Sequence, residues 1–537
     1  GVAASEVLEG LRITLSEGDR LRLEERADLA PGRIWTNQEH RLHGADPGAL
    51  RLRVFGAGGS CLLEHGPVRW SGERNRALAT EPPAPAQTPS VEELYLTGEH
   101  LEQYRHPTRC PETYWKEALA RDPGHSRANL ALGRLALQRG EWPAATRFLQ
   151  TAVQRLTARH PNPETGEAHY YLGLARQFQG HDEEARAAMA KAAWDDAWAA
   201  PAQLELAALH LRRSNPAAAR TAAEAALKRN LRSNRAHLLA AIALRRLGFA
   251  REAIERLQRL RQDDPLDFWA EAERVRAHGT GDEFFARCRN DAQTILDLVF
   301  DYANCGEWDA AEWLLEQHHA RAVTPVAVPN PMQRNIMTGY VAAWVQSQRG
   351  QPEAAAERLQ RLREEPADYF FPSRLAEQAV LHWVLEQQPD DRAACALGHF
   401  CYDRKRHADA IHWWEQAVAW NPANALALRN LGLARWNIQG DGPAARAAYS
   451  RALELAPQEA RLVAEFAQLR AKLGEPADER LAFLEEHPEG VLQRDDATVE
   501  WVTLLNDTHQ PQRALDVLLR RRFHLWEGGE GKVLRQY

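Results

Sequence analysis

The chain of 537 residues is 44% hydrophobic and 26% charged, which is typical of a folded, water-soluble protein. Its net charge of −7 provides no positive field for a nucleic-acid backbone, and no run of about 18 apolar residues predicts a membrane span. We therefore expect neither a nucleic acid nor a membrane as a partner.

The six cysteines contain no C-x2-C pair, so neither a zinc ribbon nor a thioredoxin-like motif is predicted. No basic segment precedes an apolar stretch, and we expect a cytoplasmic protein with reduced cysteines. The sequence begins at Gly1 instead of Met, shortly before strand-like residues, which suggests a fragment or a processed form.

Residues 1–75 alternate apolar and polar side chains over the short runs "LRITL", "RLRLEE", "LRLRVF" and "SCLLEH". Turn-forming stretches such as "SEGD" and "GAGG" separate these runs. The pattern predicts a small antiparallel β-sandwich domain. Residues 76–91 include "EPPAPAQTPS", whose prolines favour an extended chain, so this segment is predicted to be a linker.

From residue 92 to residue 537 the apolar residues follow a helical period and the sequence repeats itself. "AACALGHFCYDRKRHADAIHWWEQAVAWNP" matches the tetratricopeptide repeat, a pair of antiparallel helices of about 34 residues. In the next repeat, Gly432, Ala445 and Tyr449 take the places of Gly398, Ala410 and Trp414, with one extra residue before the second helix. Related units elsewhere predict a mainly α fold, a right-handed α-solenoid of about ten helical pairs.

In such a solenoid the first helix of each pair lines a concave groove, where side chains one turn apart form a ladder. These positions combine arginine, amide, histidine and aromatic side chains: Arg134, Gln138, Tyr170, Gln177, Phe178, Arg212, Arg245, Arg246, Tyr340, Trp344, Gln348, Arg392, His399, Tyr402, Arg429, Trp436 and Asn437. Guanidinium groups bind carboxylates or phosphates, and aromatic rings pack on apolar side chains or sugars. The alternative is a solvated helix face that carries arginine because arginine is the main cation of this chain.

No catalytic motif stands out, so we predict no catalytic residue, no metal and no cofactor. Paired carboxylates such as those in "WDDAW" and "RQDDP" are expected at helix ends, where acids cap the helix or are solvated. Gly531 and Lys532 resemble the end of a phosphate-binding loop. That loop needs glycine at position 526 and serine or threonine at position 533, where this chain has Trp526 and Val533. No phosphate-binding loop is therefore predicted.

Two stretches, "ELYLTGEHLEQYRHPTRCPETYWKEALARDPG" and "FHLWEGGEGKVLRQY", resemble signatures of a bacterial family of unknown function. Longer members of that family look like a galactose-mutarotase-like N-terminal half followed by a small β-domain and a tetratricopeptide array. The resemblance implies that the N-terminal half is missing from this sequence. The matching positions, expected in loops that face the missing half or its ligand, are Glu102, Tyr104, Arg105, His106, Arg109, Trp526, Glu527, Glu530 and Lys532. The alternative is that both stretches only cap the ends of the solenoid.

We expect a scaffold whose concave groove binds a protein or peptide partner, or the missing N-terminal half of the same protein. The resemblance implies an alternative, the non-catalytic or accessory part of a carbohydrate-active enzyme of mutarotase-like or glycoside-hydrolase type. Whether the parent protein is an enzyme therefore stays open. A third possibility is that the groove aromatics bind a carbohydrate directly.

Overall fold

The computed structural model describes residues 1–37, 44–67, 80–106, 108–162, 164–278, 281–322, 335–365, 367, 370–524 and 531–536. The chain divides into two compact units, Gly1–Pro82 and Pro83–Tyr537. Residues 76–79 of the predicted linker lie outside the described residues.

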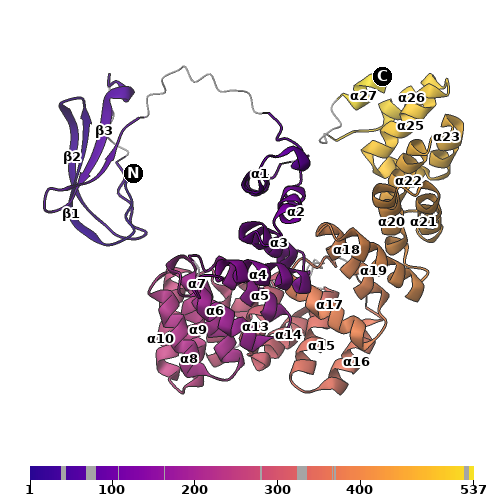
Figure 1. Ribbon diagram of the computed structural model, residues 1–537. Coiled ribbons are helices and arrows are strands. Elements are labelled where there is room, and N and C mark those ends of the chain that lie inside the picture. Colours follow the sequence, from indigo (N-terminus) through magenta and orange to yellow (C-terminus); the bar gives the residue numbers. More distant parts are fainter. Residues whose placement is uncertain are drawn as a thin grey trace. The chain divides into compact units, whose positions relative to one another are not determined.

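The first unit contains a four-stranded antiparallel sheet with the strand order β2-β1-β3-β4 (Figure 1). Its elements are β1 (Leu8–Glu17), β2 (Arg20–Leu29), the short 3-10 helix η1 (Pro47–Ala49), β3 (Leu50–Phe55) and β4 (Cys61–His65). The expected antiparallel strands are confirmed, but the described residues form one sheet instead of the two facing sheets of a sandwich.

The apolar face of this sheet is covered by the segments around Val2 and Trp35, whose backbones pair with each other, and not by a second sheet. Leu11, Ile13 and Val54 are buried on that face. Successive side chains of a strand point to opposite faces, so the neighbours of these residues lie on the other side. There Arg12 lies over the ring of Phe55, and other polar side chains pair across the strands.

The described part of the second unit contains 27 helices. The first twelve are α1 (Val91–Gln103), α2 (Pro111–Arg121), α3 (Ser126–Gln138), α4 (Trp142–Leu156), α5 (Glu167–Phe178), α6 (Asp182–Ala192), α7 (Asp196–Arg212), α8 (Pro216–Leu227), α9 (Asn234–Arg246), α10 (Ala250–Asp263), α11 (Phe268–His278) and α12 (Asp282–Arg287). The next nine are α13 (Ala292–Asn304), α14 (Trp308–Ala322), α15 (Ile336–Gln348), α16 (Pro352–Leu362), α17 (Leu375–Gln387), α18 (Asp391–Asp403), α19 (His407–Trp420), α20 (Ala425–Ala434) and α21 (Gly442–Leu455). The last six are α22 (Ala460–Lys472), α23 (Ala477–Glu486), α24 (Pro488–Gln493), α25 (Asp495–Asp507), α26 (Pro511–Arg520) and α27 (Lys532–Gln536).

Two shorter turns accompany these helices, the 3-10 helix η2 (Pro85–Gln87) before α1 and the π-helical turn η4 (Arg435–Gln439) after α20. Most consecutive helices stack as pairs, as the repeat pattern predicts (Figure 1). Within the described residues, no helix is both long and apolar enough to cross a membrane.

Several pairs are closed by a glycine of the first helix that lies against a large side chain of the second. A Cβ on Gly398 would overlap the indole of Trp414, and a Cβ on Gly98 would overlap that of Trp115. Both indoles are buried, and each donates its N–H to a carbonyl oxygen three residues before the glycine, at 3.2 Å for Trp414 and 3.3 Å for Trp115. These two tryptophans are core residues of their helical pairs.

The proline-rich segment after Pro82 packs on the second unit. The hydroxyl of Tyr114 donates to the carbonyl oxygen of Pro83 at 2.8 Å, and Arg121 donates to that of Thr88 at 2.7 Å. Thr88 itself is buried. Because α2 satisfies these carbonyl groups, residues 83–88 belong structurally to the helical array.

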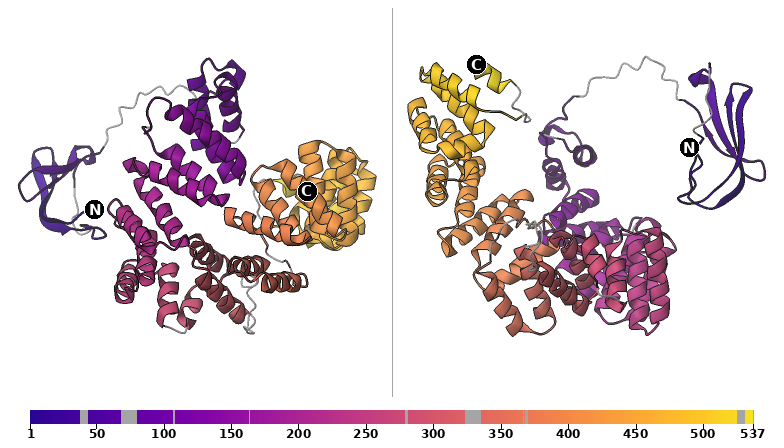
Figure 2. Two further views of the ribbon diagram at one scale, coloured as in Figure 1. Left: turned by 60° about the horizontal axis from the view of Figure 1, so that its bottom comes forward. Right: turned by 180° about the vertical axis from the view of Figure 1, so that it is seen from behind.

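Helices far apart in the sequence also meet within the second unit (Figure 1 and Figure 2). Gln177, in α5, donates to the side-chain oxygen of Asn304, the last residue of α13, at 2.6 Å. The turn after α3 contacts α17 and the residue before α19, because Gln378 and Arg406 both donate to the carbonyl oxygen of Gly140. We call the contacts of Gly140, Gln378 and Arg406 the seam. The array therefore bonds to itself across the solenoid as well as between neighbouring repeats.

Candidate functional site

All six arginines predicted to line the groove already pair with carboxylates of the chain. The pairs are Arg134 with Glu102 and Glu167, Arg212 with Asp182, Arg245 with Glu273 and Glu307, Arg246 with Glu307, Arg392 with Asp390, and Arg429 with Glu465. Glu307, for example, is only 6% exposed and follows α13, whereas Arg245 and Arg246 end α9. Arg392 pairs with the N-cap residue of its own helix, and the other five guanidinium groups join different helices. The binding of a partner by these arginines stays a prediction.

Most of the predicted aromatic side chains pack inside the array. The hydroxyl of Tyr340 is fully buried and donates to Asp390 at 2.8 Å, and burial together with this carboxylate raises the pKa of Tyr340 strongly. Three further rings lie against neighbouring rings: Tyr170 on Trp198, Tyr402 on Trp414, and Trp344 on Trp308. Neighbouring side chains of the protein thus cover these aromatic rings partly or completely.

The predicted histidine and amides have mixed surroundings. Burial, with a smaller contribution from Arg429, lowers the pKa of His399 to about 4, and its Nε2 lies 2.6 Å from the amide nitrogen of Asn430. A neutral ring that accepts this hydrogen bond fits both observations. Gln177 bonds across the solenoid, whereas Gln138 and Gln348 are exposed.

The residues carried over from the family resemblance are partly helical, which corrects the expectation that they lie in loops. Glu102 is in α1, and Lys532 begins α27. Tyr104 is 73% exposed at the end of α1, Arg105 has a positive φ of 48°, and the ring nitrogen of His106 accepts from the backbone N–H of Arg109 at 3.1 Å. Trp526, Glu527 and Glu530 lie outside the described residues.

One place combines three of the predicted residues, Arg429, Trp436 and Asn437, and it arises from the extra residue noted in that repeat. Ala410 follows Gly398 by twelve residues, whereas Ala445 follows Gly432 by thirteen. The structure accommodates the additional residue in η4, which contains Trp436 and Asn437. Single π-helical turns often occur at functional sites, because the extra residue displaces side chains from the regular helical face.

Beside η4 the structure has a small pocket of ≈ 150 Å³, which we call the π-turn pocket. It lies between the first helices of two consecutive repeats, with Tyr449 of α21 also contributing. Its lining residues are Leu433, Trp436, Asn437, Tyr449, Glu465, Gln468, Leu469 and Lys472. The volume suits one side chain of a bound polypeptide.

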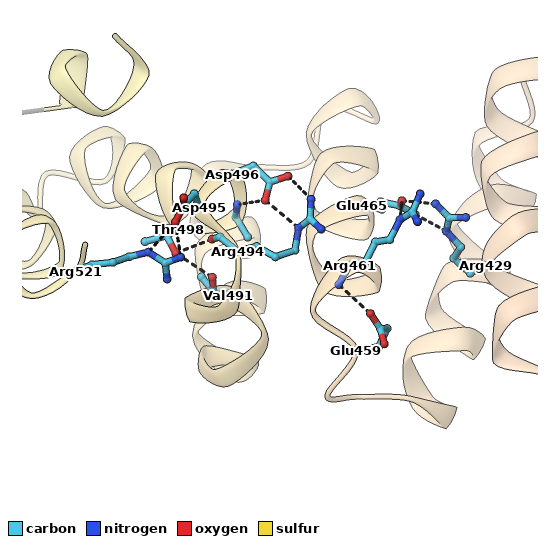
Figure 3. A network of polar contacts seen from close by, with 11 residues as sticks. Arg429, Glu459, Arg461, Glu465, Val491, Arg494, Asp495, Asp496, Thr498 and Arg521 are labelled. Atoms are coloured by element: carbon cyan, nitrogen blue, oxygen red, sulfur yellow. Dashed lines mark hydrogen bonds and ion pairs between the residues drawn. The ribbon is translucent and has the colours of Figure 1, made fainter. Parts of the chain in front are cut away.

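The charges around this pocket favour an anion. Figure 3 shows the guanidinium groups of Arg429 and Arg461 both directed at Glu465, with donor distances of 2.6 and 2.9 Å from their Nε atoms. Burial opposes the charge of Glu465, but these hydrogen bonds outweigh it and lower the pKa of this carboxyl. The hydroxyl of Tyr449 adds a further donor at 3.2 Å. Two guanidinium groups therefore face one carboxylate, and the site has a positive balance.

Lys472 adds to this balance. Its side chain is exposed at the end of α22 and has no carboxylate partner within the described residues. Gln468 and Lys472 are not among the predicted groove residues, the last of which is Asn437. They lie one turn apart on α22, the first helix of the following repeat, so the same reading extended by one repeat would have found them.

Comparison with known proteins agrees with the repeat architecture. One family model of the tetratricopeptide repeat matches residues 113–164, and a second model of the same repeat matches residues 204–268 and 402–460. The chain therefore contains tetratricopeptide repeats, a class of repeat that generally mediates interactions between proteins. Residues 1–65, which include all four strands, match the family described as "YphG-like protein, second domain".

Solved structures also match parts of the chain, at low identity. A structure of Naa15/Naa10 bound to HypK-THB has 14% identity and a TM-score of 0.27, covering 80% of this chain and 74% of that chain. A tetratricopeptide repeat protein from Parabacteroides merdae has 14% identity and a TM-score of 0.33, covering 55% and 98%. PilF of Pseudomonas aeruginosa has 17% identity and a TM-score of 0.25, covering 42% and 89%. The assignment of the repeats rests on the family matches and on the packing of the helical pairs.

Proposed function

We propose that the protein is a scaffold that binds a partner polypeptide, and that its π-turn pocket receives a carboxylate-bearing side chain of that partner. The observation that carries this proposal is the position of the pocket between two consecutive first helices, with a positive balance of charge. The partner is a separate protein or another domain of the same polypeptide. The match of residues 1–65 to the second domain of a multidomain family supports the latter.

The pocket offers each part of an acidic residue a suitable contact. The ammonium of Lys472 and the amides of Asn437 and Gln468 provide donors for a carboxylate. Trp436 and Leu469 provide apolar surface for the aliphatic stem of the same side chain. Glu465 does not oppose the anion, because its own charge is compensated by two arginines.

The proposal is tested with an array of acetylated peptides arranged in pairs. The two peptides of a pair are identical except that one has glutamate where the other has glutamine. We expect the glutamate peptides to bind more tightly, and Lys472→Met to weaken them about tenfold, equivalent to about 1.4 kcal/mol. Trp436→Ala should weaken glutamate and glutamine peptides alike. Lys228→Met is the matched control, since it removes the same charge from an exposed position at the end of α8.

Equal binding of the two peptide series would contradict the proposal. So would an equal loss of affinity in Lys472→Met and Lys228→Met, because that result would indicate attraction by net charge without a specific pocket.

A further inference from the structure

A second and larger pocket lies at the seam. Its volume is ≈ 590 Å³, and we call it the seam pocket. One wall is the turn after α3 with the first turns of α4 and the end of α5, and the other wall is α17 with the residue before α19. The walls are thus at least two hundred residues apart in the sequence, and the pocket exists only where they meet.

The seam holds both walls in place. Gln378 donates to the carbonyl oxygen of Gly140 at 3.1 Å, and Arg406 donates to that of Arg139 at 3.1 Å. The guanidinium of Arg406 also pairs with Asp409 at 2.7 Å. The positive charge of Arg406 is therefore already compensated on the side of the protein.

Aromatic rings line both walls of the pocket. The rings of Trp142 and Phe178 stack on the first wall, with centroids 5.3 Å apart and an interplanar angle of 4°. Trp383 and His382 line the second wall. Burial, then the charge of Arg406, lowers the pKa of His382, so this ring is neutral near pH 7 and adds no positive charge.

The free charges of the pocket are mainly negative. Glu141 and Glu386 line opposite walls, and within the described residues neither carboxylate takes part in an ion pair. The opposing positive charge is the exposed guanidinium of Arg147 at the edge of the first wall. Aromatic faces combined with uncompensated carboxylates attract cations, and a guanidinium group suits both partners because it stacks on rings and binds carboxylates with two hydrogen bonds.

We propose that the seam pocket binds an arginine side chain of a partner polypeptide. The site is independent of the π-turn pocket, because different helices line it and its free charges have the opposite sign. Because both walls contribute, the bound arginine also stabilises the seam contact, and the array resists unfolding more strongly when the peptide is present.

The test uses the whole chain and isothermal titration calorimetry with the peptide acetyl-Ala-Arg-Ala-Arg-Ala-amide. Its counterpart contains citrulline, which has nearly the shape of arginine but no charge. We expect the arginine peptide to bind at least tenfold more tightly than the citrulline peptide. Glu386→Gln, at an exposed position of α17, should weaken the arginine peptide about fivefold to tenfold, and Trp383→Leu should weaken it further.

Glu489→Gln is the matched control, because it removes the same charge from an exposed position of α24. It should leave the affinity unchanged, and Lys472→Met should do the same, which separates this site from the π-turn pocket. Equal affinity for the two peptides would overturn the proposal, as would equal losses in Glu386→Gln and Glu489→Gln. Binding of a neutral oligosaccharide in place of the arginine peptide would also overturn it and would indicate a sugar site.

Discussion

Arg406 donates a hydrogen bond of 3.1 Å to the carbonyl oxygen of Arg139, which lies 267 residues earlier in the chain. Arg139 is the C-cap residue of α3, where carbonyl groups have no partner within the helix. A guanidinium at this position both completes the hydrogen bonding and complements the negative end of the helix dipole. The end of one repeat is thus capped by a residue from the other side of the solenoid.

The seam depends on the absence of a side chain at Gly140. Its φ is +74°, and a Cβ there would overlap the side-chain oxygen of Gln378. Gly140→Ala should therefore cost about 1–2 kcal/mol of backbone strain and about 1 kcal/mol more for the displaced hydrogen bond of Gln378. Gly180 has the same φ of +74° in the next repeat, but a Cβ there would meet nothing within 4 Å, so Gly180→Ala should cost the strain alone.

Thermal unfolding of both glycine variants checks this prediction, and hydrogen exchange of α17 shows whether the seam opens. Equal destabilisation and equal exchange in the two variants would mean that the seam contributes nothing to stability.

The carboxylate of Glu307 should be a stability determinant of the array. It accepts from Arg245 at 2.6 Å and from Arg246, and Arg276 lies 3.6 Å away. Glu307→Gln leaves these guanidinium groups with less negative charge, so we expect a loss of about 1–3 kcal/mol, reduced from that of a fully buried pair because the arginines are 22–32% exposed.

Asp309→Asn is the control for Glu307→Gln in urea denaturation, since the side chain of Asp309 is 80% exposed in its pair with Arg349. The control should change the stability by less than about 0.5 kcal/mol. If both variants lose the same small amount, the Glu307 cluster is not a stabilising network.

The protein should become less stable as the pH is lowered, because His318 is buried in its neutral form. This side chain is fully buried, and burial lowers its pKa from 6.5 to about 4. Between these values the unfolded chain binds a proton that the folded chain does not, so the contribution is fully present above pH 6.5 and is lost as the pH falls towards 4. From pH 7 to pH 5 the loss from this residue should be about 2 kcal/mol.

Urea denaturation of the protein and of His318→Gln at pH 7 and pH 5 isolates this effect, because glutamine does not titrate. The variant should lose less stability over the same interval. His412→Gln, at an exposed position of α19, serves as the control, and a steeper pH dependence in His318→Gln would refute the assignment.

The π-helical turn should be removable at little cost. Deleting Asn437 restores the twelve-residue spacing of the preceding repeat, so we expect the unfolding free energy to change by no more than about 1 kcal/mol while the π-turn pocket is lost. Deleting Asp403 instead breaks the regular spacing between Gly398 and Ala410 and should cost more than about 3 kcal/mol. Calorimetry on both deletions checks the contrast, and retained binding of acidic peptides after deletion of Asn437 would place their site elsewhere.

The candidate site was only partly predictable. The positions of Trp436 and Asn437 followed from the repeat register, and the extra residue beside them was visible in the sequence. By contrast, the pairing of Arg245 and Arg246 with Glu307 could not be predicted, because these residues belong to repeats that are not neighbours in the sequence. The seam pocket escaped prediction for the same reason, since Trp142 and Trp383 have no local relation to one another.

The sequence by itself determined the helical pairs. The contacts of Gly98 with Trp115 and of Gly398 with Trp414 lie within one repeat, so local spacing specifies them. Only the tertiary structure decided which distant repeats meet, because that depends on small rotations between neighbouring pairs which accumulate along the solenoid. A few degrees more or less in each step would move Arg406 away from Arg139, and no single repeat encodes that sum.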